Sequence, residues 1–241
     1  EGIAPETPVS RGASLFQDRD LLSAPVVSPE GRLLGRITVD DVVDVIRDEA
    51  EHSVMSMAGL DEDADMFAGV LPSARRRGLW LGVNLATAFL AAWVVGLFET
   101  TIQNIVALAV LMPIVASMGG VAATQTLTLI VRGLALGQVE RTNARWLMTK
   151  EFAVALLNGL AWATVVAVVA MLWFRNWKIA GVIFAAMVVN LVAAALAGVA
   201  VPLVLKRFGV DPAMAGGVIV TTVTDVVGFA SLLGLGTLVL M

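Results

Sequence analysis

The final 29 residues, Ala213–Met241, read AMAGGVIVTTVTDVVGFASLLGLGTLVLM and contain a single charged side chain, Asp225. At about 1.5 Å per residue, one helix of this length crosses the roughly 30 Å hydrocarbon core of a bilayer. An ionised carboxylate near the middle of such a helix costs roughly 2.5–3.5 kcal/mol on insertion scales. Such groups occur mainly where they face a water-filled path. The stretch therefore predicts a membrane protein in which Asp225 is the leading candidate for a functional residue.

Asp225 belongs to a stripe of small and polar residues. Gly217, Thr221 and Asp225 follow one another at a spacing of four residues, which places them on one face of a helix. Tight helix packing explains the glycine and the threonine equally well, but packing has no need of a charge. We therefore interpret this face as the wall of an ion path.

The rest of the chain predicts four more membrane spans. Hydrophobic residues make up 58% of the sequence, and mean hydropathy is +0.86. The predicted spans are about 79–98, 102–131, 152–174, 179–205 and 213–240. Loops on the side of the N-terminus carry nine Arg and Lys residues, against two on the other side. By the positive-inside rule, we expect the N-terminus in the cytoplasm and the C-terminus outside.

The second predicted span carries a comparable polar stripe. Its candidate path-lining residues are Pro113, Ser117, Gly119, Gly120, Thr124 and Gln125. Proline and a glycine pair predict a kinked or locally unwound helix that exposes backbone carbonyls. Hard cations such as Mg²⁺ bind oxygen ligands. One carboxylate does not balance a divalent charge, so we expect a homodimer with the path on its two-fold axis.

Residues 1–65 form an acidic segment in front of the spans, with 15 of the 20 acidic and 5 of the 16 basic side chains. The pattern predicts a small cytoplasmic α/β module with a helix at 12–22, strands at 24–27 and 33–38, and a helix from 39 to about 51. Asp41, Asp44 and Glu49 lie on the last helix. A divalent cation bound between such surfaces would relieve their repulsion and act as a feedback switch. A solvated acidic face is the alternative.

Several classes of function are excluded by composition. The chain has no cysteine and one histidine, His52, which excludes disulfides, thiol nucleophiles and a histidine metal cluster within one chain. An intramembrane aspartyl protease needs two aspartates, and the predicted spans supply one. We therefore expect a transport protein rather than an enzyme, with the lipid bilayer and divalent cations as partners and no nucleic acid. A cation/proton exchanger with Asp225 as proton carrier remains the alternative, although no inverted repeat is visible.

Three segments carry a resemblance to a known family. They are MPIVASMGGVAATQTLTLIVRGLALG (112–137), VDPAMAGGVIVTTVTDVVGF (210–229) and APVVSPEGRLLGRITVDDVVDVI (24–46). With them the chain resembles the MgtE family of magnesium channels. Residues 1–51 look like most of a CBS module, 52–78 like the connecting plug helix, and 79–241 like the transmembrane pore domain. The chain departs from the family's pattern at Val121, Ala123, Gly217-Val218 and His52-Ser53.

The resemblance implies a mainly α-helical homodimer in the inner membrane that takes up Mg²⁺ through a central pore. It implies that Asp225 faces hydrated Mg²⁺ and that Thr221 and Gly217 line the same pore. It also implies that Asp41, Asp44 and Glu49 bind regulatory Mg²⁺, which closes the pore. A CBS module can in addition hold a nucleotide such as ATP, here at Thr38 and Asp41.

Overall fold

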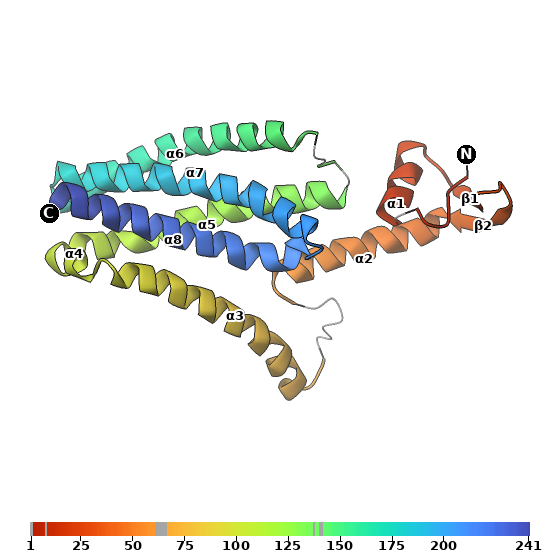
Figure 1. The fold of residues 1–241 in the computed structure, drawn as a ribbon, viewed down its shortest axis with the longest axis horizontal. Coiled ribbons are helices and arrows are strands. Elements are labelled where there is room, and N and C mark those ends of the chain that lie inside the picture. The colour runs from red at the N-terminus through yellow and green to blue at the C-terminus, as the bar shows by residue number, and fades with distance from the viewer. Residues whose placement is uncertain (1, 8, 61–66, 137, 140–141) are drawn as a thin grey trace.

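The computed structural model describes residues 2–7, 9–60, 67–136, 138–139 and 142–241. In chain order its elements are α1 (Val9–Asp18), β1 (Ser23–Val27), β2 (Leu33–Thr38), α2 (Val39–Met57), α3 (Val70–Gly96), α4 (Glu99–Asn104), α5 (Val106–Ala135), α6 (Ala144–Phe174), α7 (Trp177–Arg207) and α8 (Pro212–Leu240). Figure 1 shows a small N-terminal module at one end of an elongated molecule. Helix α2 reaches from this module to the near end of a helical bundle.

The N-terminal module has the predicted order of helix, strand, strand and helix. Strands β1 and β2 pair antiparallel from Ser23 opposite Thr38 to Val27 opposite Leu33. The turn between them contains Gly31 at φ +78°, a conformation that glycine adopts without steric cost. The core beneath the sheet consists of Ile3, Phe16, Ala24 and Val42. This core is small because the module contributes only a two-stranded sheet and the helices α1 and α2.

Helix α2 begins at a local side-chain cap. The backbone N–H of Thr38 donates to Asp41 Oδ2 at 2.9 Å, and the Thr38 hydroxyl donates to the same oxygen at 2.9 Å. These bonds lower the pKa of Asp41 below its ordinary value of 3.8, the backbone bond having the larger effect. The carboxylate of Asp41 therefore helps to fix the first turn of α2.

This cap predicts a dependence on pH. Because the folded pKa of Asp41 lies below its unfolded value, its contribution is present above about pH 4 and is lost as pH falls through the folded pKa. We expect the first turn of α2 to loosen at acidic pH, seen as a shift of the Thr38 amide resonance by NMR. The variant Asp41→Asn should lack this titration, whereas Asp40→Asn in the same turn should keep it. A Thr38 shift that survives in Asp41→Asn would contradict the assignment.

Among the described residues, the predicted connecting helix over 52–78 is not a separate element. Helix α2 continues through Glu51 to Met57, because no glycine or proline interrupts residues 39–57. The chain turns at Gly59, whose φ is +69°. Helix α3 begins at Val70, nine residues before the predicted start of the first span at Leu79. The predicted connecting segment is therefore divided between the end of α2 and the start of α3.

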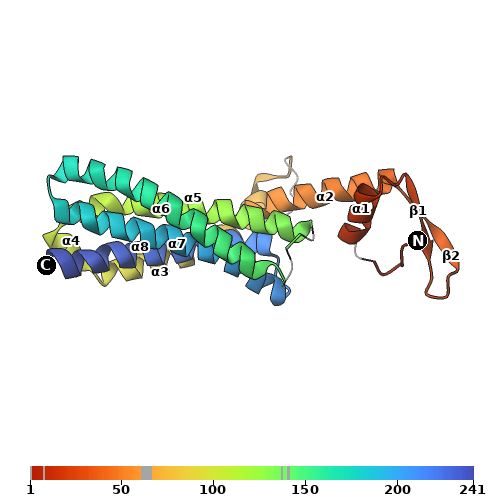
Figure 2. The same cartoon turned by 90° about the horizontal axis from the view of Figure 1, so that it is seen from above.

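The helical bundle is organised around α7, which packs along α5, α6 and α8 (Figure 2). Helix α3 contacts mainly α8. Close approach is possible because small residues recur on α7. The buried small residues of this helix are Ala186, Ala194, Ala195, Ala197 and Gly198.

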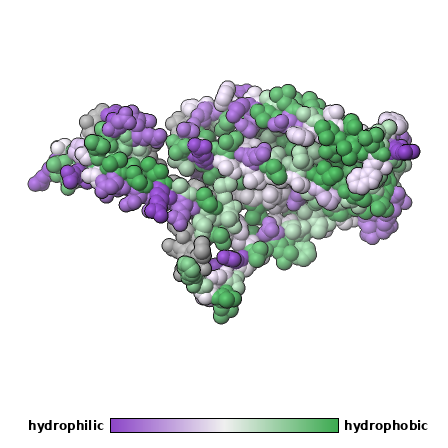
Figure 3. All heavy atoms as spheres, turned by 180° about the vertical axis from the view of Figure 1, so that it is seen from behind, coloured by the Kyte–Doolittle hydropathy of each residue, from purple (hydrophilic) through white to green (hydrophobic). Residues whose placement is uncertain are grey.

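The prediction of five membrane helices is confirmed. Helices α3, α5, α6, α7 and α8 are long and apolar enough to cross a membrane. Figure 3 shows apolar residues over much of the bundle face in view and hydrophilic residues gathered over the N-terminal module. The bundle surface is therefore suited to lipid and the module to water.

The second predicted span differs from expectation in its shape. The chain breaks at Ile105, between α4 and α5, and not at the glycine pair. Helix α5 then runs without interruption through Pro113, Gly119 and Gly120. The prediction of an unwound segment at Gly119-Gly120 is wrong, because the missing side chain of Gly119 makes room for Asn190 of α7 within a continuous helix.

Candidate functional site

The face of α8 that carries Asp225 is only partly covered by the rest of the chain. Gly217, Thr221 and Asp225 are half-buried, whereas Gly216 and Val220 on the adjacent face of the helix are buried. The Thr221 hydroxyl donates to the backbone carbonyls of Gly217 and Val218, at 2.9 and 3.0 Å. Its oxygen keeps free lone pairs that can face a cation or its water shell.

Helix α5 presents a second polar face. Pro113, Ser117, Thr124 and Gln125 are exposed and Gly120 is half-buried. The Thr124 hydroxyl donates to the Gly120 carbonyl at 2.9 Å, so its hydrogen is engaged and its oxygen points outward as an acceptor. Gly119 does not belong to this face: it is buried against Asn190, so the expectation that it lines a path is wrong.

A cavity of about 380 Å³ joins the two helices at the end of the bundle nearest the N-terminal module. It is lined by Thr124 of α5 and by Gly217 and Thr221 of α8, three of the residues predicted from sequence. Asp225 follows Thr221 by one helical turn and lies beyond the lining residues. The cavity therefore ends one helical turn short of the Asp225 carboxylate. We call it the antechamber.

Most of the other lining residues of the cavity were not predicted, and three of them belong to α3. Trp80 and Asn84 of α3 line it together with Met57, the last residue of α2. Asn84 is an amide within an apolar helix, a signal that the sequence did contain. Trp80 packs beside Gly59, where a side chain would overlap the indole. The end of α2 and the start of α3 thus form one wall of the cavity.

A polar contact links α2 directly to the start of α8. The His52 Nε2 atom lies 3.3 Å from Asp211 Oδ2. Asp211 is also the N-cap of α8, because its Oδ1 accepts from the backbone N–H of Ala213 at 2.9 Å. Met57 packs against an apolar cluster that includes Ala213 and Val220. A displacement of α2 would therefore act on the first turns of α8.

Two of the three acidic residues predicted to bind regulatory metal, Asp41 and Asp44, have side chains that the structure describes. Asp41 is engaged with Thr38, and Asp44 is exposed on the same helix. The side chain of Glu49 lies outside the described part of the structure. Among the described residues, no three Asp, Glu or His side chains lie close enough to hold a metal ion.

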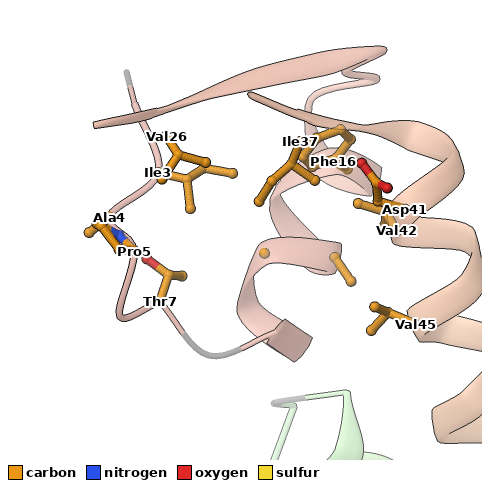
Figure 4. Close-up of a pocket in the computed structure, with 12 residues that line it drawn as sticks. Ile3, Ala4, Pro5, Thr7, Phe16, Val26, Ile37, Asp41, Val42 and Val45 are labelled. Carbon is orange, nitrogen blue, oxygen red and sulfur yellow. The ribbon is translucent and has the colours of Figure 1, made fainter. Parts of the chain in front are cut away.

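The N-terminal module has its own cavity of about 440 Å³, whose walls are mainly apolar (Figure 4). Ile3, Phe16 and Val42 form part of the wall, and Asp41 is the ionisable residue among the lining side chains described. Thr38 does not line this cavity; its hydroxyl bonds Asp41 instead. The described lining offers a surface for a flat apolar group but no basic side chain for a phosphate.

A buried acid, Glu151, also lies in the bundle. Helix α6 starts at Ala144, eight residues before the predicted third span, so it includes Glu151. This side chain is buried, lies 3.3 Å from Lys150 Nζ, and accepts a long 3.4 Å hydrogen bond from Thr126 of α5. Asp225 is therefore not the sole acid in the membrane helices. The Lys-Glu pair directly before an apolar run was the missed signal.

A family model described as divalent cation transporter, MgtE, matches residues 112–235, and a CBS domain model matches residues 2–48. The chain is 29% identical over 225 residues to the magnesium transporter MgtE of Bacillus subtilis, covering 93% of this chain and 50% of that protein.

Two further relatives carry the same name. Identity is 31% over 240 residues to the protein of Thermus thermophilus, covering 99% of this chain and 53% of that one. Identity is 32% over 213 residues to the protein of Enterococcus faecalis, covering 88% of this chain and 47% of that protein. The chain spans about half the length of the curated relatives it matches.

Proposed function

Because the chain belongs to the MgtE family of divalent cation transporters, we propose that it conducts Mg²⁺ into the cell through a path between α5 and α8. The observation that carries the proposal is the half-buried Asp225 on α8, one turn beyond a cavity lined by oxygen-bearing side chains of both helices. The names of the matched relatives support Mg²⁺ as the cargo. Carboxylate, hydroxyl and amide oxygens suit a hard cation that retains part of its water shell.

We propose that two copies of the chain enclose this path. The polar face of α5, with Ser117, Thr124 and Gln125, is uncovered in a single chain. Facing lipid, those polar groups would be unfavourable; facing the same surface of a second copy, they would line a hydrated channel. Two copies of Asp225 would then balance the charge of one divalent cation. We place this dimer in the inner membrane, with the N-terminus of each chain in the cytoplasm.

We propose that the acidic module closes the path when cytosolic Mg²⁺ is high. A cation held between Asp41, Asp44 and Glu49 of facing modules would draw the two α2 helices together. The contacts of α2 with the antechamber and with Asp211 supply a route from that movement to α8. A nucleotide such as ATP would use the module's cavity, with its base against the apolar walls and Asp41 toward the ribose.

The proposal is tested by Mg²⁺ uptake into proteoliposomes that hold a magnesium dye and a pH dye. A channel predicts uptake that follows the Mg²⁺ gradient, with no opposing movement of protons. Proton efflux in fixed proportion to Mg²⁺ entry would instead support an exchanger with Asp225 as the proton carrier. Empty liposomes and liposomes with heat-denatured protein control for leakage.

A further inference from the structure

Asn190 of α7 occupies the point where α5, α7 and α8 meet. Its side chain is 1% exposed, and its Nδ2 donates to the backbone carbonyl of Val115 in α5 at 2.8 Å. A carbonyl can only accept, so the amide nitrogen must face Val115. The amide oxygen, Oδ1, has no hydrogen-bond partner among the described residues.

Two glycines bring the neighbouring backbones against this amide. A side chain at Gly119 of α5 would overlap Asn190 Nδ2. A Cβ at Gly228 of α8 would lie 2.8 Å from the same atom and 3.0 Å from the Val115 side chain. Both helices thus approach Asn190 at positions that lack a side chain. The amide is held between them, and its place determines how closely α5 and α8 approach α7.

A gain in folding stability does not explain why residue 190 has an amide side chain. Val115's carbonyl lies in a continuous helix, so the backbone N–H of Gly119 can satisfy it without Asn190. Burial of the unpartnered Oδ1 is unfavourable, and a leucine, which has the same number of side-chain heavy atoms and the same branching, would not carry that penalty. What the amide adds is a directional bond that fixes the position of α5 along α7.

The two glycines that contact Asn190 are close in sequence to residues of the proposed path. Gly228 follows Asp225 by three residues on α8, and Gly119 directly precedes Gly120 on α5. A helical turn transmits a shift of one residue to its neighbours almost unchanged. A change at Asn190 therefore shifts the Asp225 carboxylate relative to the hydroxyl and carbonyl oxygens of α5.

We propose that Asn190 is a positioning residue for cation selection: it sets the spacing and axial offset between the two path-lining helices. The inference rests on the proposed Mg²⁺ path. It assigns no contact between Asn190 and the cation, because Asn190 is buried among the three helices. Its effect should therefore appear in the choice between cations of different size, as well as in the rate.

The test is Asn190→Leu, with Asn158→Leu as the matched control on an exposed position of α6. In proteoliposomes we expect the Mg²⁺ flux per folded Asn190→Leu protein to be about two- to tenfold below that of the wild type. This range corresponds to the free energy of one ordinary hydrogen bond. We also expect the ratio of Mg²⁺ to Ca²⁺ flux to change. The thermal midpoint should be unchanged or higher, and Asn158→Leu should alter none of these quantities.

Unchanged flux and an unchanged Mg²⁺/Ca²⁺ ratio in folded Asn190→Leu would overturn the inference while leaving the proposed function standing. A lower thermal midpoint with an unchanged ratio would show a merely structural role and would also overturn it. Gly228→Ala provides a second route, because its methyl displaces the amide without removing it; an unchanged ratio there would count equally against the inference. Absence of Mg²⁺ flux in the wild type would remove the proposed function itself.

Discussion

Asp225→Asn should reduce Mg²⁺ uptake into proteoliposomes by more than about a hundredfold. Asparagine keeps the size and one oxygen of the side chain but removes its charge. At 5 Å and an effective dielectric constant near 20, a carboxylate stabilises each unit of cation charge by roughly 3 kcal/mol, and Mg²⁺ carries two. A loss of this size exceeds the 2.7 kcal/mol or so that corresponds to a hundredfold in rate. The measurement is the initial rate of magnesium-dye fluorescence at a fixed gradient.

Two variants control for this experiment. Asp225→Glu retains the charge and should keep part of the flux, with its position shifted by one methylene group. Glu99→Gln neutralises an exposed acid of α4, outside the five spanning helices, and should leave the flux within about twofold of the wild type. Uptake by Asp225→Asn at the wild-type rate would show that the carboxylate does not face the ion.

Much of the fold could be predicted because hydrophobic length and turn chemistry are local properties. The strand at 33–38 and the start of α2 at Val39 agree with the structure, since the strand ends in the Thr38–Asp41 cap. The last span was predicted to within one residue at its start, where Asp211 and Pro212 mark the beginning of a helix. These features depend on neighbours in sequence.

The starts of α3 and α6 were placed too late for a different reason. Charged side chains, Arg75–Arg77 in α3 and Lys150 in α6, interrupt the hydropathy pattern but not the helix. Long basic side chains near a helix end can extend to the membrane surface. Hydropathy therefore located the apolar centre of each helix rather than its ends.

The candidate site was predictable only in part. A helical period identifies a face but not the neighbour that covers it, so Gly119 was assigned to the path although Asn190 covers it. The polarity of Asp225, Thr221 and Thr124 was visible in the sequence. Asn84 was visible as an amide within an apolar helix, but its place beside the cavity with Trp80 was not, because α3 reaches the antechamber through tertiary packing with residues of α8 more than a hundred positions away.

A second prediction concerns closure of the Mg²⁺ path at high cytoplasmic Mg²⁺. The triple variant Asp41→Asn, Asp44→Asn and Glu49→Gln should continue to conduct when the Mg²⁺ concentration on the cytoplasmic side is high. Under the same conditions the wild type should lose flux by roughly 5- to 150-fold, the usual range of coupling between two sites. Asparagine at 41 retains an oxygen that can accept from the Thr38 amide, so α2 should still form. The measurement is initial flux as a function of Mg²⁺ on the cytoplasmic side.

The control for this variant removes the same charge from elsewhere in the module. Glu6→Gln, Asp18→Asn and Asp20→Asn together neutralise three exposed acids outside α2, so the two triple variants have equal net charge. If closure depends on a cation held by α2, the control should close as the wild type does. Equal loss of closure in both variants would indicate a general electrostatic effect of the acidic module, and normal closure in the α2 variant would show that its acidic face is only solvated.

The position of α2 favours the outcome in which only the α2 variant loses closure. Asp44 is exposed on a helix whose last turn, through Met57, lines the antechamber and whose His52 contacts the N-cap of α8. A helix transmits force along its axis with little bending, because each turn is held by backbone hydrogen bonds. A cation that binds at residues 41–49 therefore acts on the same helix that lines the antechamber and contacts Asp211, about one to four turns further along. The control acids, Glu6 before α1, Asp18 at its end and Asp20 after it, are not on the helix that meets α8.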